Sequence, residues 1–158
     1  MRLSPMLALA AIAVALPAPA NAQTRPAAIE TERLAELNAW TVGAITRGEG
    51  ALAPDLWRNS DAAFVASLLD RLPAVYESPA AQALARRVLL SGGEAPNGDA
   101  AQAARERFEA LGKMGAADEL AIMATGAGAS LADPAIAQYA AQAELSRGRR
   151  PEACARGR

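Results

Sequence analysis

Three observations in the sequence predict an all-α fold made of antiparallel helical hairpins. Alanine is the dominant residue, and aromatic residues make up only 4% of the 158-residue chain, a composition that favours helix over strand. Apolar residues recur at helical spacing in several segments. Serine or aspartate precedes most of these segments and glycine follows them, as at helix starts and ends.

The first 22 residues have the order of a secretory signal peptide. Met1 and Arg2 form a cationic start, an apolar run is best developed over residues 6–16, and small residues stand at Ala20 and Ala22. We expect cleavage after Ala22, which places the mature chain in the periplasm or outside the cell. The run is shorter than the roughly 20 residues of a transmembrane helix, so no integral membrane segment is expected after signal removal.

Residues 23–90 are predicted to be an N-terminal helical half. A first helix is expected from Ile29 to Thr46, stopped by the glycines of residues 48–50, and residues 51–59 read as a connection. The next helix is expected to begin at Ser60 as N-cap, to bury Phe64, Leu68 and Leu72, and to end at Pro73.

A further helix is predicted from Ser78 and Pro79, a capping serine followed by a proline at the first helical position. Its expected buried stripe comprises Ala81, Leu84, Ala85 and Val88. Residues 91–98 are rich in glycine and polar side chains, and they form the predicted boundary between the two halves.

The second half, residues 99–158, is predicted to hold two helical hairpins and a frayed basic tail. Asp99 is expected to cap a helix with Ala101, Ala104, Phe108 and Leu111 inward, and Arg105 to pair with Glu109. After a turn at residues 112–115, a short helix is expected to end at Gly126. Asp133 and Pro134 then start a helix with Ile136, Tyr139, Ala140 and Ala143 inward, and Gly148 turns the chain again.

These hairpins suggest a repeat. Asp99 and Asp133 open helices 34 residues apart, and Leu111 and Leu145 lie near their ends at the same offset. The segment 148–153 is similar to the turn and second-helix start of tetratricopeptide (TPR) repeats, so residues 99–156 resemble a degenerate TPR-like pair. The whole chain resembles exported alanine-rich helical proteins of alphaproteobacteria. The resemblance implies a TPR-like or short α-solenoid arrangement, with an irregular bundle as the alternative.

Composition excludes several classes of chemistry. The chain has no histidine, which rules out histidine-based acid–base catalysis and histidine metal sites. Its single cysteine, Cys154, allows no intramolecular disulfide and is expected to be a small apolar helix residue. Removing Arg2 with the signal leaves 15 basic and 17 acidic residues, a net charge of −2, so a nucleic-acid partner is not expected.

Carboxylates are the remaining candidates for chemistry, and none forms a convincing pair. Glu32 and Glu36 lie one helical turn apart beside a basic residue, which indicates a solvated face. Asp118 and Glu119 are adjacent, which suits charge at a helix start. Residues 91–93 lack the lysine of a phosphate-binding loop. We therefore predict no catalytic, cofactor or metal residues.

Binding a protein partner is a more promising function for this chain than catalysis. Trp40 is expected in the core, while Trp57 and Tyr139 are candidate contacts because aromatic residues are enriched at interfaces. Arg149 and Arg150 belong to a C-terminal arginine cluster that is either solvated or faces an acidic partner or membrane surface.

The sequence thus predicts an exported, non-enzymatic module that binds or scaffolds another protein in the cell envelope. A periplasmic holdase and a truncated remnant of a longer repeat protein are alternatives. A carboxylate-only enzyme would require Glu32, Asp55 or Asp70 to meet in a deep pocket.

Overall fold

The computed structural model describes residues 37–156 of the chain. The predicted signal peptide and the carboxylates Glu32 and Glu36 lie outside these residues. The described chain is all-α, as predicted, and its helices belong to one compact unit, residues 34–158. In order they are the 3-10 helix η1 (Arg47–Glu49), α1 (Ala62–Asp70), α2 (Pro79–Leu90), α3 (Ala101–Lys113), α4 (Ala117–Gly126), the 3-10 helix η2 (Gly128–Ala132), α5 (Pro134–Ser146) and α6 (Arg150–Arg156).

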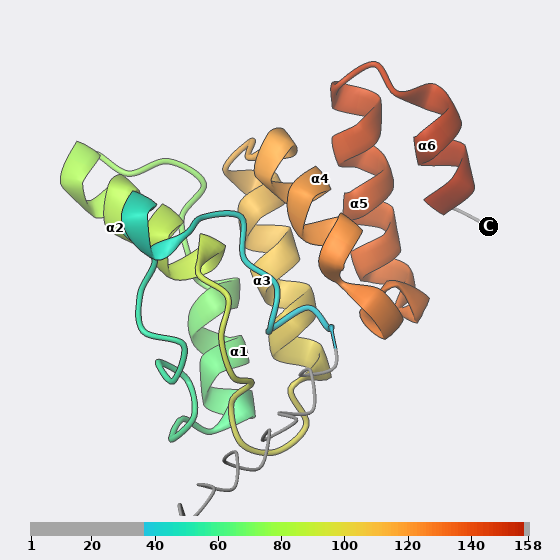
Figure 1. Cartoon of the computed structure of the whole chain (residues 1–158). Helices are drawn as coiled ribbons and strands as arrows, with labels where there is room; N and C mark the ends of the chain where they lie inside the picture. The colour runs from blue at the N-terminus through green and yellow to red at the C-terminus, as the bar shows by residue number, and fades with distance from the viewer. Residues whose placement is uncertain (1–36, 157–158) are drawn as a thin grey trace, which may run out of the picture. The chain divides into compact units, whose positions relative to one another are not determined.

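Helix α3 lies at the centre of this unit and packs against α1, α2, α4 and α5 (Figure 1). Ala104, Phe108 and Leu111 are buried along it, as predicted, whereas Ala101 is exposed. Helices α3 with α4 and α5 with α6 form two successive hairpins, and α4 also packs against α5. Along residues 37–156 no helix is both long and apolar enough to cross a bilayer.

The expected helix from Ile29 to Thr46 is wrong over its described part, which contains turns and bends but no helix. The side-chain oxygen of Asn38 accepts hydrogen bonds from the backbone N–H groups of Trp40 and Thr41, which closes a turn instead of a helix. Further along, Gly43 lies so close to Gly92 that a Cβ added to Gly43 would stand 2.4 Å from the backbone nitrogen of Gly92. These contacts with a distant loop override the helical preference of the sequence.

Helix α1 exposes the face that we expected to be buried. Its N-cap is Asp61, whose side chain accepts from the backbone of Phe64, and not Ser60. Phe64 and Leu68 are exposed, whereas Val65 and Leu69 are buried against the core. The two stripes have the same four-residue spacing, so periodicity alone could not choose between them.

Helix α2 begins as predicted, with Ser78 as N-cap and Pro79 in the first turn. Its predicted buried stripe is wrong at Leu84, which is 54% exposed. The buried residues are instead Leu89 and Leu90 at the C-terminal end.

The predicted pair between Arg105 and Glu109 is also wrong. Arg105 forms an ion pair with Asp133 (Nε to Oδ2, 2.6 Å), and Glu109 pairs with Lys113 (2.8 Å). The first pair joins α3 to the start of α5, where Asp133 is the N-cap and Pro134 follows, as predicted.

Candidate functional site

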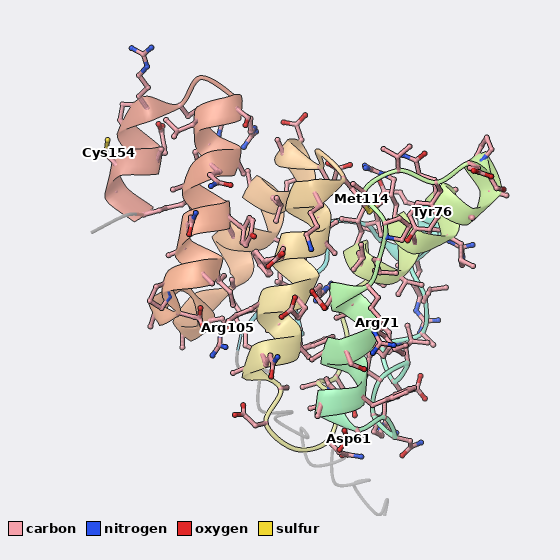
Figure 2. The ribbon with its side chains drawn as sticks, turned by 180° about the vertical axis from the view of Figure 1, so that it is seen from behind. Asp61, Arg71, Tyr76, Arg105, Met114 and Cys154 are labelled. Atoms are coloured by element: carbon pink, nitrogen blue, oxygen red, sulfur yellow. The ribbon has the colours of Figure 1, made fainter. Side chains whose placement is uncertain are left out.

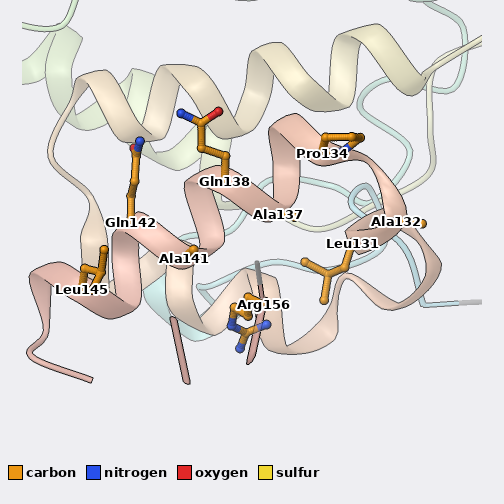
Figure 3. Close-up of a pocket in the computed structure, with 9 residues that line it drawn as sticks. All are labelled: Leu131, Ala132, Pro134, Ala137, Gln138, Ala141, Gln142, Leu145 and Arg156. Carbon is orange, nitrogen blue, oxygen red and sulfur yellow. The ribbon is translucent and has the colours of Figure 1, made fainter. Parts of the chain in front are cut away.

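A groove runs along the outer face of α5, and we call it the α5 groove (Figure 3). Its volume is about 590 Å³. Helix η2 closes one side, and Arg156 faces the groove from α6. The lining residues are Leu131, Ala132, Pro134, Ala137, Gln138, Ala141, Gln142, Leu145 and Arg156. A second hollow, which shares Leu131 and Arg156, extends it towards Glu152 and Ala155.

The sequence of α5 explains why this face is hollow. Ile136, Ala140 and Ala143 are buried on the core side of the helix. The opposite side carries Ala137 and Ala141, which contribute only methyl groups and so leave space beside the backbone. The result is a shallow channel beside a helix whose outer face is uncharged.

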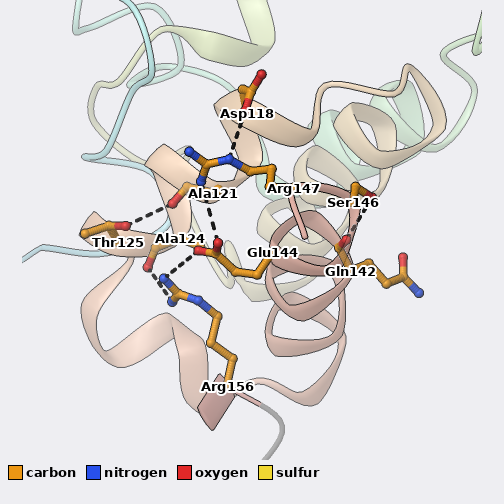
Figure 4. Close-up of polar contacts among 9 residues, drawn as sticks. All are labelled: Asp118, Ala121, Ala124, Thr125, Gln142, Glu144, Ser146, Arg147 and Arg156. Atoms are coloured by element: carbon orange, nitrogen blue, oxygen red, sulfur yellow. Dashed lines mark hydrogen bonds and ion pairs between the residues drawn. The ribbon is translucent and has the colours of Figure 1, made fainter. Parts of the chain in front are cut away.

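A cluster of charged side chains fixes the hairpin that frames the groove (Figure 4). Glu144, the only charged residue of α5, is 3% exposed and points towards α4 and α6. Its carboxylate lies 3.6 Å from Arg147 and 3.4 Å from Arg156, and Arg147 also pairs with Asp118 at 2.9 Å. Buried ion pairs of this kind specify geometry, because removing one partner leaves the other charge uncompensated.

Arg156 is incompletely satisfied in this cluster. One terminal nitrogen donates to the carbonyl of Ala124 at 3.5 Å and the other to Glu144 at 3.4 Å, both long hydrogen bonds. The Nε atom is buried and has no hydrogen-bond partner among residues 37–156. Because this Nε is buried, it is not open to a ligand, and Arg156 contributes its positive charge to the lining of the groove.

A second buried arginine, Arg107, holds the other half of the fold. It is 1% exposed, and its guanidinium donates to the carbonyl oxygens of Ala39 (2.6 Å), Leu89 (2.8 Å) and Ser91 (2.8 Å). Longer contacts reach two further carbonyls, and the guanidinium lies 5.5 Å from the centre of the Trp40 ring.

Arg107 forms no ion pair with a carboxylate between residues 37 and 156, and its role is to join the segment after residue 37 to the end of α2. Complete burial lowers the pKa of Arg107 to about 9, which still leaves it protonated at neutral pH. Sequence reasoning missed this residue, although it follows Ala104 by three positions and precedes Leu111 by four. Those spacings place it on the buried stripe of α3.

The four predicted partner contacts occupy different places. Trp57 is half-buried and packs edge-on against the buried Trp40, with ring centres 6.2 Å apart. Tyr139 is half-buried on α5 and faces Gly112 of α3. Arg149 at the end of the α5–α6 turn and Arg150 at the start of α6 are exposed, just beyond the Leu145 end of the α5 groove.

The residues considered for chemistry do not converge in the described chain. Asp118 pairs with Arg147, and Glu119 pairs with Arg86. Between residues 37 and 156 no three potential metal ligands cluster. Asp55 and Asp70 line none of the hollows described above.

The glycines of the 91–98 loop serve close packing. A Cβ on Gly92 would stand 2.6 Å from the carbonyl oxygen of Thr41, and one on Gly93 would stand 2.3 Å from that of Pro54. Cys154 is exposed on the outer side of α6 (Figure 2).

Comparisons with protein families, with curated proteins and with solved structures gave no match for this chain.

Proposed function

We propose that this protein is an exported, non-enzymatic helical module that binds another protein of the cell envelope through the α5 groove. The observation that carries the proposal is the outer face of α5, which is uncharged and hollow along most of its length. A helix face of this kind on the surface is suited to receive another apolar element.

The dimensions favour a helical segment as the bound element. From Pro134 to Leu145 the face spans 12 residues, or about 18 Å at 1.5 Å per residue. Alanines at positions 137 and 141 allow the backbone of a second helix to approach closely, at the short end of the 8–10 Å range of interaxial distances. The TPR-like character of the two hairpins, which the sequence suggests, agrees with this use.

Site-specific photo-crosslinking tests the proposal. A photoreactive amino acid replaces Ala141 in the groove, and the control carries the same amino acid at Ala83, an exposed alanine of α2. In envelope fractions of the source organism we expect a discrete crosslinked protein from position 141 and none from position 83. Equal labelling from both positions, or none from position 141, would contradict the proposal.

A holdase is the second candidate, and one observation favours it. Large apolar side chains are exposed on α1 and α2, among them Phe64 (60%), Leu68 (44%) and Leu84 (54%). A holdase would suppress the aggregation of a model substrate, and Phe64→Ser with Leu68→Ser would abolish that effect. An unchanged aggregation rate with the wild-type protein would eliminate this candidate.

A further inference from the structure

The charges around the α5 groove indicate the chemistry of its occupant, and this inference rests on the proposed function. We propose that the groove binds an acidic amphipathic helix, with small apolar residues on one face and carboxylates beside it. The argument combines the apolar floor of the groove with the arginines placed around it.

The apolar residues on the floor of the groove indicate which side chains a bound helix would place against it. Ala137 and Ala141 leave the space, while Leu131 and Leu145 mark its two ends with larger apolar side chains. Gln138 and Gln142 stand along the edge of the same face (Figure 3). Small or medium apolar residues at i, i+3 and i+4 of a bound helix fit such a surface.

The charged residues beside the groove indicate which charges a bound helix would carry next to its apolar face. Arg149, just before α6, and Arg150, its first residue, are exposed, and neither forms an ion pair with any residue between 37 and 156. Arg156 also lines the groove, where its guanidinium is paired with the buried Glu144. Glu152 is the one acidic residue that lines either hollow, and Arg149, Arg150 and Arg156 belong to the same hairpin. The rim is therefore positive and complements carboxylates.

The concave shape favours a peptide helix over a membrane surface. A bilayer is contacted best by apolar side chains that protrude, as in amphipathic helices lying in the interface. Here the apolar atoms form the floor of a channel, and the flanking Gln138 and Gln142 are polar.

Fluorescence anisotropy with synthetic probes tests this inference on the purified full chain. The probe is a helix-stabilised peptide of about 15 residues, long enough to cover the groove, with alanine and leucine on one face and glutamates on its flanks. The matched peptide carries lysines in place of the glutamates. We expect saturable binding of the acidic peptide, weakened by raising the salt from about 0.05 to about 0.5 M because exposed charges are screened, and no binding of the lysine peptide.

Three variants locate the binding. Ala141→Trp fills the groove and should abolish binding. Arg149→Glu with Arg150→Glu should weaken binding about tenfold, since two surface charge contacts become repulsive. Arg71→Glu at the C-cap of α1 is the matched control, since it reverses one exposed arginine outside the α5–α6 hairpin, and it should leave binding unchanged (Figure 2).

Several outcomes would overturn the inference. They are equal binding of the two peptides, binding that Ala141→Trp leaves intact, and binding to anionic phosphatidylglycerol vesicles but not to the acidic peptide. Failure here is separable from failure of the proposed function. Crosslinking from Ala141 without peptide binding would retain a partner and reject its acidic chemistry, whereas absence of both would reject the groove as a docking site.

Discussion

Replacing Arg107 by methionine should destabilise the protein more than any exposed substitution. Methionine retains much of the volume but leaves the carbonyl oxygens of Ala39, Leu89 and Ser91 without their short hydrogen bonds, which measure 2.6–2.8 Å. Bonds to charged groups contribute about 1.5–3 kcal/mol each, so three would give about 4–9 kcal/mol if they were additive. Because neighbouring contributions overlap, we expect a loss near the lower end, about 4 kcal/mol.

Urea unfolding followed by circular dichroism measures this loss. With an m-value of about 1.5 kcal/mol/M, typical of a chain of this size, the midpoint should fall by about 2.5 M. The matched control is Arg105→Met, two residues away on the same helix, which removes the half-exposed pair with Asp133 and should cost about 1 kcal/mol or less. Arg107→Lys should be intermediate, because a single ammonium cannot reach carbonyls on both sides of the site.

The reasoning fails if Arg107→Met and Arg105→Met have the same midpoint. Equal midpoints would mean that the carbonyl oxygens released from Arg107 accept hydrogen bonds from water or other donors at no cost in free energy. A variant of Arg107 that is already unfolded without urea, beside a folded Arg105→Met, would agree with the prediction.

Three further results are expected. Although partial burial opposes it, hydrogen bonds from Arg105 and from the helix N-terminus lower the pKa of Asp133. Asp133 therefore stabilises the protein above the ordinary aspartate pKa, and this stabilisation is lost as the pH falls through the lowered pKa. In Asp133→Asn, the free energy of unfolding should depend less steeply on pH in this acid range. Gly92→Ala should lower the thermal midpoint, because the new Cβ would meet the carbonyl of Thr41 at 2.6 Å, whereas an unchanged midpoint would show that the loop shifts freely. Glu144→Gln should weaken the attachment of α6 and speed proteolysis in the α5–α6 turn, and equal cleavage rates would refute that role.

Helices α3, α4 and α5 were predictable because local signals and tertiary packing agree there. Two details were wrong: the N-cap of α3 is Ala100 and not Asp99, and the tail that we expected to be frayed is helical over Arg150–Arg156. Asp133 and Pro134 start α5 by capping and by a preset backbone angle, and both effects operate within one turn. Gly148, with a φ of 75°, likewise turns the chain after α5 where the sequence indicates.

The segment after residue 37 could not be predicted because distant contacts determine it. Its residues form turns that fit against the loop after α2, with the N–H of Ala44 donating to the carbonyl of Leu90. The buried guanidinium of Arg107 then satisfies other carbonyls of the same segment. None of these partners is close in sequence, so helical propensity alone gave the wrong answer.

The candidate site was only partly visible in the sequence. Arg149 and Arg150 stood out as a basic cluster, and they lie beside the groove. The groove itself depends on the absence of bulk at Ala137 and Ala141 and on the positions of η2 and α6 around them. Alanine in a helix predicts close packing equally well, so only the three-dimensional arrangement distinguishes a filled face from an open one.

The most direct test of docking at the α5 groove is an NMR titration of the isotope-labelled protein with the acidic helical peptide. We expect backbone amide signals of residues 135–145, 149–150 and 152–156 to shift in a saturable manner, while those of α1 stay in place. Shifts confined to α1 and α2, or an unchanged spectrum at millimolar peptide, would contradict docking at this site.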